Sequence, residues 1–164
     1  MVVINNTLAK LEGESSRVNE AQQDEAFANT GAADIPFGYV VVKDSSENGG
    51  GKLPAAGDDT QVGIAIREVK QGDVNGAANV GIGEQGTVKR VGYVWVKVVY
   101  GYASVVDGGK VYYRYALGGT GSATRAIGTI EQAAVTSEVI ELVGAKFNGI
   151  CDSDQLVEVR LGIF

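Results

Sequence analysis

The chain has 164 residues, 45% of them apolar, which is enough for one domain with a buried core and excludes disorder over its whole length. Its formal net charge is −6, so the phosphates of DNA or RNA would be repelled, and nucleic acid is not expected as a partner. The sequence has no His and one Cys, which excludes an internal disulfide and any catalytic site that needs His.

Residues 1–34 are predicted to form an extended N-terminal arm. They hold two basic and six acidic residues, so this part of the chain carries −4 of the net charge, and they include few large apolar side chains. Residues 2–4 have the composition of a short strand, and residues 12–28 show at most a weak helical pattern. An arm with so little core material either stays loose or docks on a neighbouring molecule.

Residues 35–164 are predicted to form an all-β domain. Its clearest strand alternates, with Val94 and Val96 on one face and Tyr93 and Trp95 on the other. The 24 glycines of the chain, scattered between Val-rich segments, indicate tight turns that join short strands. The predicted strands are residues 39–43, 62–67, 87–100, 110–115, 126–130, 139–143, 144–147 and 155–161.

Turns and one short helix complete the predicted pattern. Residues 48–51 break the chain after the first strand, residues 70–86 form a Gly- and Asn-rich loop, and Asp107-Gly108-Gly109 supplies the positive φ angles of a hairpin turn. One short helix is expected within residues 131–138. Seven or more short strands without βαβ alternation favour a small β-barrel or sandwich of short antiparallel strands.

The residues that carry chemistry are scarce. Cys151 is expected to be a packing residue, since Cys is among the residue types most often buried. We predict no catalytic residue, no metal ligand and no cofactor-binding residue. No stretch approaches 18 apolar residues and no basic segment precedes an apolar one at the start, so we expect neither a membrane span nor a signal peptide, and synthesis in a reducing cytoplasm.

Two patterns imitate functional motifs. Residues 81–86 match G-x-G-x-x-G, but a loop precedes them and a strand follows, so no helix would begin where a dinucleotide pyrophosphate must bind. The acidic pairs at 58–59 and at Asp152 and Asp154 lack the further ligands of a calcium loop and are expected to be solvated turn carboxylates. A carboxylate pair for glycoside cleavage stays open as an enzymatic alternative.

An aromatic group on the predicted strands has two interpretations. Tyr and Trp are enriched at protein interfaces, so the group indicates an inter-subunit or carbohydrate-contacting face. The other interpretation, ordinary packing within the sheet, accounts for the group without any partner. The members are Tyr93, Trp95, Tyr100, Tyr102, Tyr112, Tyr113 and Tyr115.

The order of these segments resembles the structural cement proteins that decorate the capsids of tailed bacteriophages. The first segment is similar to the family's Ile-Pro-Phe-Gly followed by a Val-rich strand, and a later one to its Gly-x-(Val/Ile)-Trp-Val strand. The resemblance runs from about Ile35 to Leu161. Its segments are 33–41 (ADIPFGYVV), 51–54 (GKLP), 61–68 (QVGIAIRE), 92–98 (GYVWVKV), 107–112 (DGGKVY), 144–147 (GAKF) and 156–161 (LVEVRL).

The resemblance implies a decoration domain over residues 35–164 that binds the outside of the expanded head as homotrimers. It would contact the major capsid protein and stabilise the shell against internal DNA pressure, on the capsid exterior of a virion assembled in a bacterial cytoplasm. No catalytic or cofactor residues come with the family. The alternative is a carbohydrate-binding β-module of a virion or surface appendage.

Overall fold

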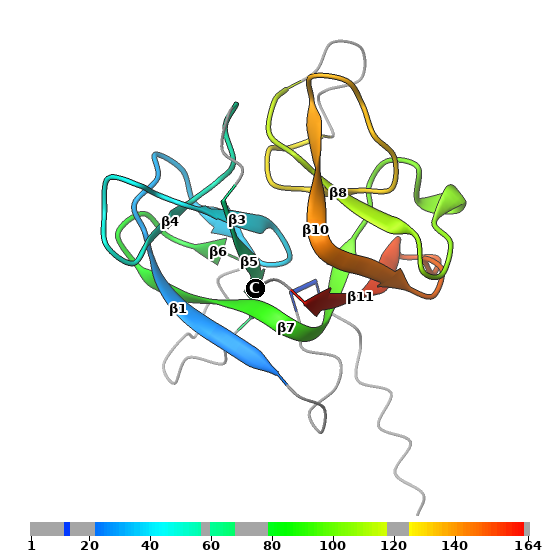
Figure 1. Ribbon diagram of the computed structural model, residues 1–164, viewed down its shortest axis with the longest axis horizontal. Helices are drawn as coiled ribbons and strands as arrows, with labels where there is room; N and C mark the ends of the chain where they lie inside the picture. The colour runs from blue at the N-terminus through cyan, green and yellow to red at the C-terminus, as the bar shows by residue number, and fades with distance from the viewer. Residues whose placement is uncertain (1–11, 14–21, 57–59, 68–78, 118–124, 163–164) are drawn as a thin grey trace, which may run out of the picture.

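The computed structural model describes residues 12–13, 22–56, 60–67, 79–117 and 125–162, and in these segments the regular structure is almost entirely β (Figure 1). The one helical element among them is a 3-10 turn, η1 (Tyr102–Ser104). The prediction of an all-β domain is confirmed. The strands are β1 (Gln23–Asn29), β2 (Ile35–Pro36), β3 (Val40–Lys43), β4 (Gly50–Lys52), β5 (Gln61–Ile66), β6 (Asn79–Val80), β7 (Gln85–Lys97), β8 (Lys110–Arg114), β9 (Ile130–Glu131), β10 (Val139–Asn148) and β11 (Leu156–Gly162).

Nine strands form one sheet that closes on itself twice. The strands β1, β4, β3, β5 and β7 are neighbours in that order, and β1 also pairs with β7, so these five strands form a closed barrel. From β7 the sheet continues through β11, β10, β8 and β9, and a bridge between Val98 and Ile130 brings β9 back beside the chain that leaves β7. The long strand β7 therefore belongs to both rings, and Figure 1 shows it running from the group of strands on the left to the group on the right.

Two hydrophobic cores fill this architecture. The barrel core lies within the five-stranded barrel and includes Phe27, Val41 and Val88. The larger core includes Val40 of β3 and Val94 of β7 together with residues of β8, β10 and β11. Because successive side chains of a strand point to opposite faces, β3 and β5 supply both cores, which explains why their apolar residues run without interruption.

Most of the predicted strands are confirmed. Val94, Val96 and Val98 are fully buried on one face of β7 and its continuation, as the alternation predicted. The segments 139–143 and 144–147 join into the single strand β10, whose pairing with β8 shifts register between Glu141 and Lys146. Only the end of the predicted strand 126–130 is in a strand, β9.

The prediction of a short helix within residues 131–138 is wrong. Glu131 ends strand β9, and the following residues form bends and turns. Ser137 has a φ of 64°, which an α-helix does not allow. Both acidic residues at the ends of the segment bind the same buried arginine, Arg114 of β8, and this contact holds the segment in its irregular path.

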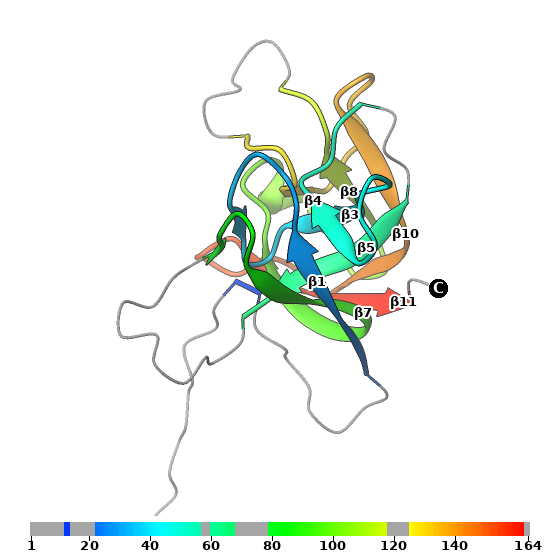
Figure 2. The same ribbon diagram turned by 90° about the vertical axis from the view of Figure 1, so that its left-hand side faces the viewer.

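The C-terminal part of the predicted arm lies in the sheet. Where residues 12–28 showed a weak helical pattern, β1 pairs with β7 from Gln23 to Ala28, and Figure 2 shows β4 beside its C-terminal end. The expected strand at residues 2–4 lies outside the described residues. The division of the chain into an arm and a body at residue 34 stays a prediction.

Candidate functional site

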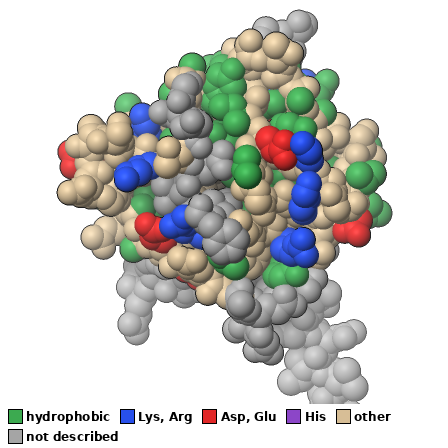
Figure 3. Space-filling view, in the orientation of Figure 1, with side chains coloured by type: hydrophobic (Ala, Val, Ile, Leu, Met, Phe, Trp, Pro, Cys, Tyr) green, Lys and Arg blue, Asp and Glu red, His purple; other side chains and the backbone are tan. Residues whose placement is uncertain are grey.

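Seven large hydrophobic side chains are exposed among the described residues, and Figure 3 shows that side chains of this kind are spread among polar ones on the face it presents. Three of the seven, Tyr100, Tyr102 and Val106, lie in the connection between β7 and β8. We call residues 99–106 the aromatic loop. The concentration of exposed apolar area in one short loop marks it as a candidate contact surface.

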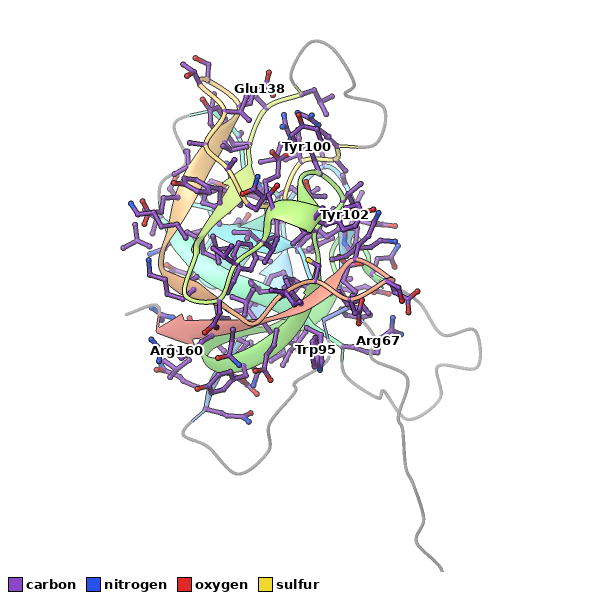
Figure 4. All side chains as sticks on the ribbon, turned by 90° about the vertical axis from the view of Figure 1, so that its right-hand side faces the viewer. Arg67, Trp95, Tyr100, Tyr102, Glu138 and Arg160 are labelled. Carbon is purple, nitrogen blue, oxygen red and sulfur yellow. The ribbon has the colours of Figure 1, made fainter. Side chains whose placement is uncertain are left out.

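The aromatic loop is held by the core at both ends. Val98 before it is fully buried and Val105 within it is 4% exposed, and both belong to the larger core. Gly101 has a φ of 71°, and its carbonyl accepts the N–H of Ser104 at 2.8 Å, which starts the 3-10 turn. These fixed points leave Tyr100 48% and Tyr102 40% exposed, on the side of the molecule that Figure 4 presents.

A cation lies against one of the two exposed rings. The guanidinium carbon of Arg125 is 3.2 Å from the ring centroid of Tyr100. Such a contact stabilises both side chains by about 0.5–1 kcal/mol at an exposed position. The loop thus presents two phenol rings and a fixed positive charge.

Three charged residues that follow this loop in the sequence, Arg114, Glu131 and Glu138, form a buried ion triad. Arg114 of β8 is fully buried, its Nε donates to Glu131 Oε1 at 2.5 Å, and its Nη1 donates to Glu138 Oε2 at 2.7 Å. Burial alone would lower the pKa of the guanidinium, but the hydrogen bonds to the two carboxylates outweigh it and raise the pKa. A Cβ added to Gly101 would lie 2.8 Å from Nε2 of Gln132, so the aromatic loop packs directly on the residue that follows Glu131.

The rest of the aromatic group is less exposed than the two tyrosines of this loop. Tyr113 is fully buried in the larger core, so ordinary packing accounts for it. The remaining members of the group are half-buried: Tyr93, Trp95, Tyr112 and Tyr115.

A second arrangement, which the sequence did not indicate, anchors the N-terminal segment. Gly13 donates its N–H to the carbonyl of Trp95 at 2.8 Å and accepts the N–H of Arg67 at 2.9 Å. Burial raises the pKa of the Glu12 carboxyl to about 7, although Lys97 and Arg67 act against this shift. The Glu12 side chain packs directly against Gly38. A Cβ at position 38 would lie 2.2 Å from Glu12 Cγ, so only glycine leaves room for it.

The motifs that imitate functional sites have structural roles. Of residues 81–86, the first four form the turn between β6 and β7 and the last two begin β7, so no helix begins there. Asp152 Oδ1 accepts the N–H groups of Asp154 and Leu156 and so closes the turn before β11. Residues 58–59 lie outside the described residues.

Cys151 is half-buried against the larger core, and burial raises the pKa of its thiol to about 11. Among the described residues, no three His, Cys, Asp or Glu side chains are grouped as metal ligands would be. No helix in the same segments is long and apolar enough to cross a membrane.

Comparisons with known proteins bear on the whole chain. A family model described as "Structural cement protein (E217 gp24/Pam3 gp6)" matches residues 4–162. A chain from the solved structure titled "The capsid of Myoviridae Phage XM1" is similar with a TM-score of 0.69 and 18% identity, over 98% of each chain, and this likeness shows the fold. No curated protein matches the chain.

Proposed function

Because the family model spans residues 4–162, this chain belongs to the phage structural cement protein family, and we propose that it binds the outer surface of the expanded head and stabilises its shell. The partner in this proposal is the major capsid protein, and the shell is stabilised against the internal pressure of packaged DNA. The family match is the observation that carries the proposal. We propose no catalytic role for the chain.

Binding stabilises a shell by simple linkage. A protein that binds the assembled, expanded state and not its dissociated subunits shifts the equilibrium towards assembly by mass action. On a symmetric lattice each copy contributes the same contacts, so weak contacts add up over the whole shell. The double closure of the sheet around β7 supports this role, since strands with partners on both sides resist separation.

We propose that copies assemble as trimers on the shell. Three copies related by a three-fold axis form a closed ring, in which each copy uses two different surfaces, one for each neighbour. Exposed Tyr side chains suit such contacts, because they bury a large rigid area and keep a hydroxyl that can form hydrogen bonds. The aromatic loop is our candidate for contact with the shell or with a neighbouring copy.

Co-sedimentation tests the proposal. Purified protein is mixed with expanded shells of the parent phage that lack it, the shells are pelleted, and the bound copies are counted. Saturable binding at a copy number that fits the three-fold positions is the expected result. Absence of binding to expanded and unexpanded shells alike would overturn the proposal, and binding on a glycan array would then favour the carbohydrate-binding alternative.

The same assay tests the contact surface. We expect Tyr102→Ala to weaken binding at least tenfold, since aromatic residues at the centre of interfaces often contribute about 2 kcal/mol. Ile82→Ala is the matched control, because Ile82 is 59% exposed but lies in the turn between β6 and β7. Equal affinities for the two variants would show that the aromatic loop makes no contact.

A further inference from the structure

Among the described residues, one edge of β1 has no neighbouring strand over most of its length. Ala28 donates its N–H to Gly49 at 3.0 Å and Thr30 donates to Gly51 at 3.0 Å, so these groups face β4. In a strand the backbone groups of every second residue face the same edge, so those of Ala26 and Asp24 face this edge too. The pairing of β1 with β4 is limited to Ala28 and Asn29, and no described residue pairs with the edge before them.

This edge borders a cleft of about 320 Å³. Glu25 and Ala26 of β1 form one wall, and Lys43, Gly50 and Thr60 contribute to the rest of the lining. A volume of this size is at the lower end of ligand pockets and suits a few residues of extended chain.

The charges around the cleft favour a carboxylate. Lys43 is exposed and has no ion pair among the described residues, while Arg90 is paired with Glu25 at 2.7 Å. Arg90 Nε is buried and has no hydrogen-bond partner in the described part of the chain. Two cations against one carboxylate make this lining positive on a protein whose net charge is −6, and Figure 3 shows basic side chains beside an acidic one over the region of β1 and β4.

The same edge is protected against pairing with another whole sheet. The register of β1 shifts between Gln23 and Asp24, and the strand carries two charged side chains, Asp24 paired with Lys89 and Glu25 paired with Arg90. Short, bulged and charged edges are the devices by which proteins prevent unwanted sheet-to-sheet association. The edge therefore favours a single extended segment over a second folded sheet.

From these observations we propose that the cleft between β1 and the β3–β4 turn binds an extended, carboxylate-bearing segment of the capsid shell protein by adding it as a strand to β1. The proposal rests on the function proposed above and names the second point of contact. The main-chain groups of Asp24 and Ala26 would supply hydrogen bonds, and Lys43 and Arg90 would select an acidic side chain.

Two variants test the proposal in the co-sedimentation assay. Ala26→Pro removes the N–H that faces the cleft and keeps the ladder with β7, because Ala26 and Thr87 form a pair without mutual hydrogen bonds. Lys43→Glu reverses the charge of an exposed side chain. We expect each variant to weaken shell binding about tenfold, which is the contribution of one hydrogen bond or close charge pair.

Arg160→Glu is the matched control, since Arg160 is exposed on β11 and its reversal changes the net charge by the same amount. Hydrogen exchange on the wild-type complex supplies a second readout, in which the segment 24–26 is expected to gain protection upon shell binding. Thermal melting of the free variants establishes whether both are folded. If Ala26→Pro is unfolded, the binding of Lys43→Glu and the hydrogen exchange of the wild-type complex test the cleft proposal without it.

Each outcome is decisive. Wild-type affinity in both folded variants, or unchanged exchange at residues 24–26, overturns the cleft proposal and leaves the function intact. Absence of wild-type binding to shells overturns both. If the variants instead lose self-association in solution and keep shell binding, the occupant is a second copy of this chain, and the shell protein is excluded.

Discussion

The Glu12 anchor makes a pH dependence of stability the sharpest prediction from the structure. The pKa of the carboxyl is about 7 in the folded protein against an ordinary value of 4.5, because the side chain is largely buried. Between these two pH values the folded state holds a proton that the unfolded state has lost. The free energy of unfolding therefore falls as the pH rises from 4.5 to 7, since deprotonation favours the unfolded chain.

The size of the effect follows from the same two values. Each pKa unit corresponds to about 1.4 kcal/mol, so the full difference is about 3 kcal/mol. Glu12 retains some solvent exposure, and we therefore expect about 2 kcal/mol in practice. Glu12→Gln resembles the protonated carboxyl at every pH, so the variant should match the wild type near pH 4.5 and exceed it by about 2 kcal/mol at pH 8.

Urea unfolding of both proteins between pH 4.5 and pH 8 measures this difference. Glu47→Gln is the control, because Glu47 is exposed in the turn between β3 and β4 and the chemical change is the same. If the curves of wild type and Glu12→Gln run parallel over this range, the carboxyl is not buried, and the account of how residues 12–13 dock between Trp95 and Arg67 is wrong.

Three further changes have expected results that follow from single contacts. Gly63→Ala should destabilise the fold by about 2 kcal/mol in thermal melts, because the added Cβ would lie 2.4 Å from the carbonyl oxygen of Lys89 on the neighbouring strand β7. Glu131→Gln should cost about 3 kcal/mol by urea unfolding, since it removes one of the two carboxylates that neutralise the buried Arg114. Cys151 should react with iodoacetamide at pH 8 about a hundredfold more slowly than a free cysteine, because its thiol pKa is about 11, and unfolding should abolish this difference.

Each of these has a clear contrary result. Wild-type melting of the Gly63 variant would mean that β5 and β7 are further apart than the backbone places them. For the triad, Lys110→Ala is the control, because the Lys110–Glu141 pair is exposed on both sides and should contribute little to the free energy of unfolding. If Glu131→Gln lowers the free energy of unfolding no more than Lys110→Ala does, Arg114 is not both buried and charged. Rapid alkylation of folded protein would place the thiol in solvent.

Alternation of apolar residues was sufficient to predict the strands that border the larger core. From Gly92 to Lys97 of β7 every second residue is buried, so Val94 and Val96 carry a local signal that does not depend on the rest of the fold. In β11 the apolar Val157, Val159 and Leu161 recur at every second position and are buried, although Leu156 and Glu158 beside them are buried too. The run at Val40, by contrast, showed a buried strand but not that its two faces belong to different cores. That fact depends on strand order, which local patterns do not contain.

The elements that were missed are those whose partners lie far away in the sequence. β1 has only Phe27 and Asn29 buried, because one of its edges borders a cleft and its outer face is exposed, so its composition is that of a polar arm. The segment that begins at Glu131 has helical composition, but its acidic residues bind Arg114, 17 and 24 residues away. A buried ion triad is a tertiary contact that overrides local propensity, and no periodicity records it.

The double closure around β7 limits how this protein can bind others. Each strand of the nine-stranded sheet has partners on both sides over at least part of its length, so backbone groups are mostly engaged within the fold. Among the described residues, two candidate contact surfaces remain: loop side chains, of which the aromatic loop presents the largest exposed group, and the section of β1 that β4 leaves uncovered. These two surfaces differ in chemistry, since one is aromatic and the other offers backbone hydrogen bonds and positive charge. Salt should therefore weaken binding through the cleft more than binding through the aromatic loop, and comparing the salt dependence of Lys43→Glu with that of Tyr102→Ala would separate the two contributions.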